Sequence, residues 1–269
     1  HHDRKAQHRK AQSRHTRRTM LQGATALGLA SVLATPALRA KAAAGLETVS
    51  MSLPEGKQVN AAFAPAAREG RPSILLIHEW WGLNDQIKTM AAAFAAEGYN
   101  ALAVDLYGGK AAADGDREAA RSLMLAVNPA TARATLGAWI NWLMSRDGAS
   151  DKIATCGWCF GGAWSLNTSL LRPVDATVVY YGDVARDAKA LSALKGPVLG
   201  HFATKDGYIN ADMVSSFVAA MNEAAKDYEI HWYEADHAFA NPTSARYDEG
   251  DAALAWTRTL DFLDDQFAA

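Results

Sequence analysis

The residues best suited to covalent chemistry lie in one short segment, Cys156-Gly157-Trp158-Cys159-Phe160-Gly161-Gly162. Its Gly-x-Cys-x-Gly pattern is the cysteine form of the nucleophile elbow, a tight turn that joins a strand to a helix. Such a turn leaves no room for a side chain two residues before or after the nucleophile, which explains both glycines. At the start of a helix, the dipole and the free N–H groups favour a thiolate. The segment therefore predicts that Cys159 is a nucleophile.

The same segment allows two other interpretations. Cys156 and Cys159 also form a Cys-x-x-Cys pattern, which is typical of thiol–disulfide oxidoreductases. Free cysteines are also often buried simply as small apolar side chains. Because Cys156 lies within a predicted strand, its side chain should face away from the nucleophile, and this weighs against a redox pair.

The elements that must position this cysteine follow from the periodicity of apolar residues. Apolar or alternating runs predict strands at 48–53, 59–64, 73–78, 101–106, 152–156, 176–181, 197–203 and 228–234. Helical spacing predicts helices at 85–97, 117–126, 130–146, 163–171, 210–225 and 248–267. This alternation predicts the α/β class, with a mostly parallel central sheet and helices on both faces. Residues 45–269 are enough for one domain with a sizeable core.

Candidate catalytic side chains follow several of these strands, where functional residues of α/β sheets gather. Cys159, Asp206 and His237 occur in the order nucleophile, acid, histidine, which is the chain order of α/β-hydrolases. Asp206 precedes a glycine and could be only a turn residue. Asp236 is a competing acid, but a sequence neighbour cannot easily turn back to orient His237. The joint pattern predicts an α/β-hydrolase fold and a Cys-His-Asp triad.

The other histidines are weaker candidates for the base. His201 and His231 lie inside predicted strands, so we expect them in the core or on the sheet surface. His78 precedes Glu79 and should point to the opposite face. A non-catalytic, ligand-binding protein of the same fold remains a third alternative to the hydrolase and the oxidoreductase.

The chain resembles the dienelactone hydrolase family (carboxymethylenebutenolidases) over nearly all of residues 46–267. The likeness rests on Ile77-His78-Glu79-Trp80-Trp81-Gly82-Leu83-Asn84, Asp105-Leu106-Tyr107-Gly108, Gly157-Trp158-Cys159-Phe160-Gly161-Gly162, Lys205-Asp206 and His237-Ala238-Phe239-Ala240. The resemblance implies that Cys159, Asp206 and His237 form the triad. It implies further that Glu79 contacts the nucleophile in the resting enzyme. A carboxylate beside the thiol would compete with His237 for its proton and so gate thiolate formation; the alternative is that Glu79 is a buried structural acid. The oxyanion hole would consist of the backbone N–H groups of Trp80 and Phe160.

The sequence departs from the family where a substrate carboxylate would bind. Members that cleave dienelactone hold that carboxylate with arginines, and the matching positions here are Gly109 and Asn241. A bidentate carboxylate clamp is therefore not evident, although Arg246 is close in sequence and could substitute. Trp81 and Tyr107 are further candidates for substrate binding, and together with Trp80 and Trp158 they suggest an aromatic pocket, although aromatic residues at strand ends as often serve only in packing. We expect a substrate that need not carry a negative charge.

The first 44 residues have the composition of an export signal. Arg17 and Arg18 precede a modest apolar run to about Ala37, which is typical of a twin-arginine signal, and Ala42-Ala43-Ala44 offers a cleavage site. Residues 1–44 hold 9 of the 27 basic residues but 1 of the 29 acidic residues. Residues 45–269 thus carry 18 basic and 28 acidic residues, a net charge of −10. We expect a periplasmic or secreted protein without stable membrane insertion after cleavage; the alternatives for this segment are an uncleaved membrane anchor and a disordered tail.

Composition also limits the cofactors and partners. An acidic domain is a poor nucleic-acid binder. The histidines are not at ligand spacing and there are only two cysteines, so we expect no metal and no cofactor. The expected partner is a small ester or lactone, and the sequence does not indicate the oligomeric state.

Overall fold

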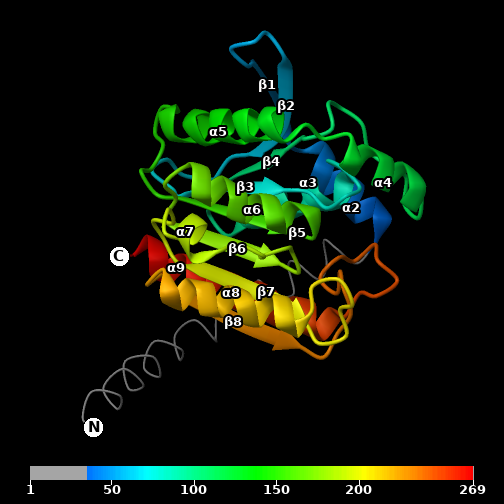
Figure 1. The fold of residues 1–269 in the computed structure, drawn as a ribbon. Helices are drawn as coiled ribbons and strands as arrows, with labels where there is room; N and C mark the ends of the chain where they lie inside the picture. Colours follow the sequence, from blue (N-terminus) through cyan, green and yellow to red (C-terminus); the bar gives the residue numbers. More distant parts are fainter. Residues whose placement is uncertain (1–34, 269) are drawn as a thin grey trace, which may run out of the picture.

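The computed structural model describes residues 35–268 and is built around one eight-stranded sheet (Figure 1). The strand order is β1-β2-β4-β3-β5-β6-β7-β8. The strands are β1 (Glu47–Ser52), β2 (Gln58–Ala64), β3 (Ser73–Ile77), β4 (Asn100–Val104), β5 (Ile153–Trp158), β6 (Ala176–Tyr180), β7 (Val198–Ala203) and β8 (Tyr228–Tyr233). β1 pairs antiparallel with β2, and β2 pairs antiparallel with β4. Every other neighbouring pair is parallel, as the sequence predicts.

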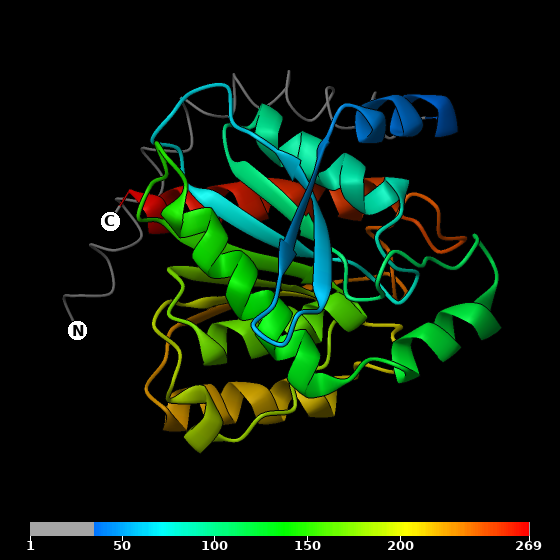
Figure 2. The same ribbon diagram turned by 90° about the horizontal axis from the view of Figure 1, so that it is seen from above.

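Helices cover both faces of the sheet (Figure 2). They are α2 (Pro36–Ala44), α3 (Asp85–Ala96), α4 (Arg117–Leu125), α5 (Pro129–Ser145), α6 (Phe160–Leu171), α7 (Ala188–Leu191), α8 (Ala211–Glu223) and α9 (Glu249–Phe267). Buried side chains of α3 and α9 share one apolar cluster with the sheet. Those of α5 and of α8 lie in two clusters on the other face. The α/β-hydrolase arrangement predicted from the sequence is confirmed.

The central strands are parallel and covered on both faces, so they consist almost entirely of buried residues. Every residue of β3, β4, β5, β6 and β7 is buried. The edge strand β8 instead mixes exposed and buried positions, because one side of it faces solvent. Apolar runs in the sequence therefore located the central strands to within one or two residues.

Two helices were not predicted. α7 has only four residues, too few for a helical periodicity to be recognised. α2 falls inside the segment predicted to be an export signal, and it packs against α3, where the Thr89 hydroxyl donates to the Arg39 carbonyl at 3.1 Å. The predicted twin arginines, Arg17 and Arg18, lie outside the described residues. Within residues 35–268, no helix is both long and apolar enough to cross a membrane.

Candidate active site

The turn between β5 and α6 places Cys159 at the carboxyl edge of the sheet in a strained conformation. Its φ of 54° lies in the left-handed region, which L-residues seldom adopt. The glycines on either side allow this turn. A Cβ on Gly157 would lie 1.9 Å from the Gly161 carbonyl oxygen, and a Cβ on Gly161 would lie 2.1 Å from the Ile77 carbonyl oxygen. The predicted role of both glycines is confirmed.

Cys159, His237 and Asp206 form a continuous hydrogen-bonded chain. The Cys159 Sγ lies 3.1 Å from His237 Nε2, and His237 Nδ1 lies 2.6 Å from Asp206 Oδ2. Asp206 follows β7 and His237 follows β8, so three strand ends supply the three side chains. The competing acid, Asp236, is exposed. The structure thus brings together the three residues that the sequence analysis selected.

The electrostatics of this chain favour a protonated histidine. Burial opposes protonation of His237, but hydrogen bonds to Asp206 and Cys159 outweigh it and raise its pKa to about 10. Burial likewise favours a neutral Asp206. Hydrogen bonds from His237 and from backbone N–H groups outweigh it and hold the Asp206 pKa below its usual value. The arrangement can therefore stabilise an imidazolium between a thiolate and a carboxylate.

Two backbone N–H groups beside the nucleophile are available to an oxyanion. Within the described range 35–268, no hydrogen bond of the structure uses the N–H of Trp80 or of Phe160. Phe160 is the first residue of α6, where an N–H has no partner in its own helix. Trp80 follows Glu79 at the end of β3, which is the strand next to β5. Both positions match those that the resemblance implies.

The contacts of Glu79 differ from the expectation of a bond to the nucleophile. Glu79 is 4% exposed; its Oε1 accepts from the Tyr181 hydroxyl at 3.1 Å and its Oε2 from Asn241 Nδ2 at 2.6 Å. The thiol of Cys159 is paired with His237 instead. Burial raises the pKa of Glu79, while the two hydrogen bonds and the nearby His237 oppose this rise. These partners of Glu79 were not predicted, because they lie far from it along the chain; position 241 was singled out only as a possible carboxylate-binding position.

The side chain of Cys156 lies in the core and is not disulfide-bonded to Cys159. It is fully buried in the apolar cluster beneath α3 and α9, and burial raises its thiol pKa well above the usual value. Both cysteines are free thiols. A redox pair needs an accessible, low-pKa thiolate, so this geometry disfavours the oxidoreductase alternative.

The remaining histidines have structural partners, as expected. His201 is fully buried between the hydroxyls of Tyr233, at 2.8 Å, and Thr259, at 2.9 Å. His231 lies 2.5 Å from the Glu229 carboxylate on the edge strand β8. Buried His78 is bonded to the Glu79 carbonyl oxygen and to the Leu106 N–H. None of these three joins the Cys159–His237–Asp206 chain.

The expected aromatic pocket is only partly present. Trp80 and Trp81 are half-buried and in contact, with ring centroids 5.1 Å apart. Trp158 is 2% exposed and stacks on Tyr180 in the core, so its assignment to the pocket is wrong. The reason is strand alternation: Trp158 lies two residues after Cys156 and shares its inward face.

Tyr107 and Arg246 are the other two candidate substrate-binding residues, and Arg117 is a cation that was not predicted. Tyr107 is buried, and its hydroxyl donates to the Trp80 carbonyl at 3.0 Å. Arg246 lies on an exposed loop. The guanidinium carbon of Arg117 lies 5.7 Å from the centre of the Trp80 ring. The sequence analysis did not single out Arg117, because nothing in its local pattern links the start of α4 to the end of β3.

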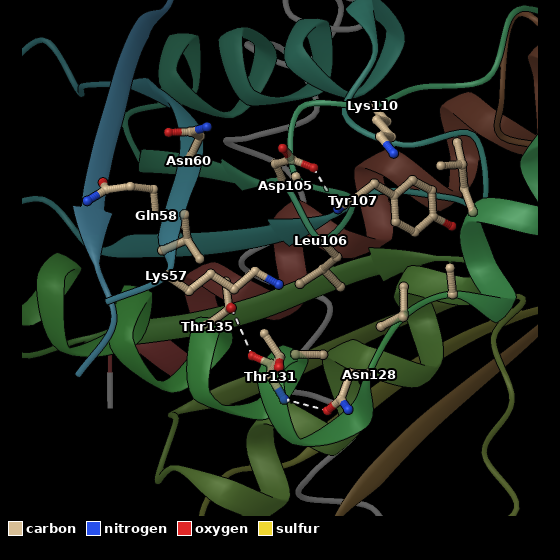
Figure 3. A pocket seen from close by; sticks show the side chains of 16 residues that line it. Lys57, Gln58, Asn60, Asp105, Leu106, Tyr107, Lys110, Asn128, Thr131 and Thr135 are labelled. Carbon is tan, nitrogen blue, oxygen red and sulfur yellow. Dashed lines mark hydrogen bonds between the residues drawn. The ribbon is translucent and has the colours of Figure 1, made fainter. Parts of the chain in front are cut away.

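A separate pocket of about 200 Å³ lies between β2, the residues after β4 and the start of α5 (Figure 3). Tyr107 lines this pocket and also packs against His78, with ring centroids 4.6 Å apart. Other lining residues include Lys57, Asn60, Asp105, Lys110, Asn128 and Thr131. Cys159, Asp206 and His237 do not line it, so this hollow is distinct from the candidate site. Among the described residues, no cluster of three His, Cys, Asp or Glu side chains could hold a metal ion.

Known proteins resemble both the sequence and the fold. The model of the "Dienelactone hydrolase family" matches residues 60–267. A carboxymethylenebutenolidase from Pseudomonas putida is 28% identical over 226 residues, covering 81% of this chain and 95% of the relative. A crystal structure from Klebsiella pneumoniae, assigned as a dienelactone hydrolase, superposes with a TM-score of 0.73 and 27% identity over 82% of this chain and 99% of that one. An esterase from Thermogutta terrifontis shares the fold, with a TM-score of 0.60 and 18% identity over 83% and 93% of the two chains.

Proposed function

This chain belongs to the dienelactone hydrolase family and is an ester or lactone hydrolase, and we propose that Cys159 is its nucleophile. The observation that carries the proposal is the unbroken chain from Cys159 Sγ through His237 to Asp206, at 3.1 and 2.6 Å. Family membership disfavours the non-catalytic alternative. The burial of Cys156 disfavours the oxidoreductase alternative.

In the proposed reaction, His237 Nε2 takes the thiol proton and the Cys159 thiolate attacks the carbonyl carbon. The carbonyl oxygen becomes an oxyanion, which the N–H groups of Trp80 and Phe160 stabilise. The C–O bond of the ester then breaks, and His237 gives its proton to the leaving alkoxide. A thioester on Cys159 remains. His237 next removes a proton from water, which attacks the thioester and releases the acid and the thiol.

Asp206 supports both halves of this reaction. Its Oδ2 accepts from His237 Nδ1, which fixes the imidazole tautomer and leaves Nε2 facing the sulfur. Its Oδ1 accepts from the N–H groups of Tyr208 and Ile209 at 2.7 and 3.0 Å. These backbone bonds prevent the carboxylate from turning away, so the histidine stays oriented throughout the cycle.

The decisive experiment compares two cysteine variants on small activated esters. Cys159→Ala should abolish hydrolysis and labelling by iodoacetamide at the site. Cys156→Ala is the matched control: it removes the buried thiol of the core and should keep the activity of any protein that folds. Full activity in Cys159→Ala would refute the proposal. Loss of activity in a folded Cys156→Ala would indicate that both thiols are needed, as the oxidoreductase alternative requires.

The natural substrate is proposed to be a neutral ester or lactone. Neither Gly109 nor Asn241 offers a cation, and the Asn241 amide is already bonded to Glu79 and Thr243. Nothing in this proposal requires a cofactor or metal, because the nucleophile, the base and the oxyanion donors all come from the chain itself.

We also propose that the protein is exported through a twin-arginine signal. Arg17 and Arg18 before an apolar run support this proposal. A reporter fused after residue 44 should be exported in bacteria, and the Arg17→Lys, Arg18→Lys pair should block its export. A reporter that reaches the periplasm equally well with both arginines replaced would refute it.

A further inference from the structure

We propose that Asn241 and Tyr181 are positioning residues that clamp the Glu79 carboxyl away from Cys159, so that the triad is assembled before substrate arrives. The inference rests on the proposed role of Cys159 as nucleophile. It concerns a group that the reaction scheme does not use: a fully enclosed carboxyl with both oxygens occupied by neutral donors.

The orientation of the Asn241 amide is fixed by its neighbours. The backbone N–H and the hydroxyl of Thr243 both donate to Asn241 Oδ1, at 2.9 and 2.8 Å. A backbone N–H can only donate, so the atom facing it must be the amide oxygen, and Nδ2 must face Glu79. Asn241 is 1% exposed, so its amide is shielded from solvent. It therefore acts as a rigid donor to Glu79 Oε2.

Tyr181 holds the second oxygen from an equally fixed position. Its φ of 39° lies in the left-handed region, and its N–H donates to the His201 carbonyl at 2.8 Å. Its ring packs edge-on against His237, with centroids 5.2 Å apart. Burial raises the pKa of its hydroxyl well above the usual value, so the hydroxyl remains a proton donor. A strained backbone held in this way commonly marks a functional position.

The position of Glu79 explains why such a clamp matters. Ile77 of β3 pairs with Gly157 of β5, so two residues further on Glu79 and Cys159 leave the sheet at the same level. A carboxylate free to turn toward the thiol would accept its proton in a hydrogen bond and compete with His237. It would also repel the thiolate, since like charges disfavour ionisation. Holding both oxygens elsewhere removes this competition.

Asparagine suits this task because it adds no charge. A cation at position 241 would form an ion pair with Glu79, and its positive charge would also be available to a substrate carboxylate. The neutral amide binds the carboxyl through Nδ2 and brings no positive charge to the site, and its Oδ1 is occupied by Thr243. Asn241 thus holds Glu79 and at the same time leaves position 241 without a cation.

The test measures how fast iodoacetamide alkylates Cys159 in the ligand-free protein between pH 4 and 9. In Asn241→Leu, the midpoint of the alkylation profile should rise by about one pH unit, which is about a tenfold slower reaction below the midpoint. The double variant Asn241→Leu with Glu79→Gln should return to within about threefold of Glu79→Gln alone. If Asn241 had only a structural role, Asn241→Leu would slow alkylation equally in the wild-type and the Glu79→Gln backgrounds. Glu79→Gln would then not restore the alkylation rate.

Two further variants keep the test decisive. Asn100→Leu is the matched control, because Asn100 is a buried amide with backbone partners at the start of β4, and its profile should match the wild type. If Asn241→Leu does not fold, Tyr181→Phe removes only the hydroxyl on Oε1 and should shift the midpoint in the same direction.

The outcomes separate this inference from the proposed function. An unchanged or lowered midpoint in Asn241→Leu, in a protein whose wild type hydrolyses esters, would overturn the clamp and leave Cys159 as nucleophile. A wild type that hydrolyses esters equally well after Cys159 has been alkylated would overturn both.

Discussion

At the residue scale, Asp206 does two separate things with its two carboxylate oxygens: Oδ2 orients His237, and Oδ1 is fixed by backbone N–H groups. Asp206→Asn keeps the shape but can place an NH₂ group against His237 Nδ1 and favour the wrong tautomer. We expect kcat to fall by about 10³- to 10⁴-fold, the loss seen when a triad acid becomes an amide. The measurement is kcat on an activated ester at pH 7–8.

Asp236→Asn is the control for this prediction, because Asp236 adjoins His237 in sequence but is exposed. It should change kcat by less than threefold. A larger loss in Asp236→Asn than in Asp206→Asn would mean that the acid of the triad has been misassigned.

The raised pKa of His237 predicts a specific pH dependence of stability. The folded pKa is about 10 and the ordinary value is 6.5, so the charged form is stabilised by folding. That contribution is fully present below pH 6.5 and is lost as the pH rises through 10. We expect the difference in free energy of unfolding between wild type and His237→Gln to be constant below pH 6.5. Above pH 6.5, the free energy of unfolding of the wild type should fall steadily relative to that of His237→Gln as the pH rises.

Urea unfolding of both proteins at intervals from pH 5.5 to 10.5 would measure this difference. Because the same titrations outside the site occur in both proteins, they cancel in the comparison. A difference that stays flat across the window would contradict the raised pKa.

Single residues also show how far the sequence could predict the site. Cys159, Asp206 and His237 were predictable because each follows a strand, and parallel strands end at one edge of the sheet. The partners of Glu79 were not predictable. Tyr181 and Asn241 lie 102 and 162 residues away from it, and only the three-dimensional packing brings them to its carboxyl.

At the element scale, the site depends on how closely α6 approaches the end of β3. A Cβ on Gly161 would lie 2.1 Å from the Ile77 carbonyl oxygen and 2.5 Å from that of His78. Both are backbone atoms of a central strand end and cannot easily move. We expect Gly161→Ala to lower the free energy of unfolding by about 3 kcal/mol or more, at or above the upper end of usual overpacking costs.

Gly250→Ala provides the contrast in α9, where the nearest atom to an added Cβ is a side-chain oxygen at 3.5 Å. Alanine there should raise the free energy of unfolding by up to about 1 kcal/mol, because glycine is a weak helix former. Thermal or urea unfolding of both variants measures the two effects. Equal changes in the two variants would show that the approach of α6 to β3 is not tight.

Elements also reveal where sequence patterns were insufficient. Long apolar runs and helical periods located the strands and the longer helices, since burial on both faces imposes such runs. α7 is a single short turn without a period, so it left no pattern. α2 lies mostly in the predicted cleavage region of the export signal, which includes Ala42-Ala43-Ala44, and in the structure this helix packs on α3. Ala43 is the one buried residue of this helix, so it left no helical period of apolar residues in the sequence.

At the scale of the whole molecule, net charge and the local site make the same prediction about the substrate. Residues 45–269 carry a net charge of −10, so the long-range field repels anions, although salt screens it beyond about 8–10 Å. Arg117 lies over the Trp80 ring, and Arg246 is on an exposed loop. An unpaired carboxylate that entered the site would lose hydration at a cost of several kcal/mol.

We therefore expect a neutral substrate to react at least as well as an anionic one. The comparison is kcat/KM for a dienelactone carboxylic acid and for its methyl ester at equal ionic strength. Long-range repulsion predicts in addition that added salt raises kcat/KM for the acid and leaves the ester unchanged. A hundredfold preference for the acid, about 2.7 kcal/mol, would contradict the prediction and would require a cation at the site. Arg117→Gln and Arg246→Gln would then identify it, because the variant that removes the preference carries the carboxylate-binding group.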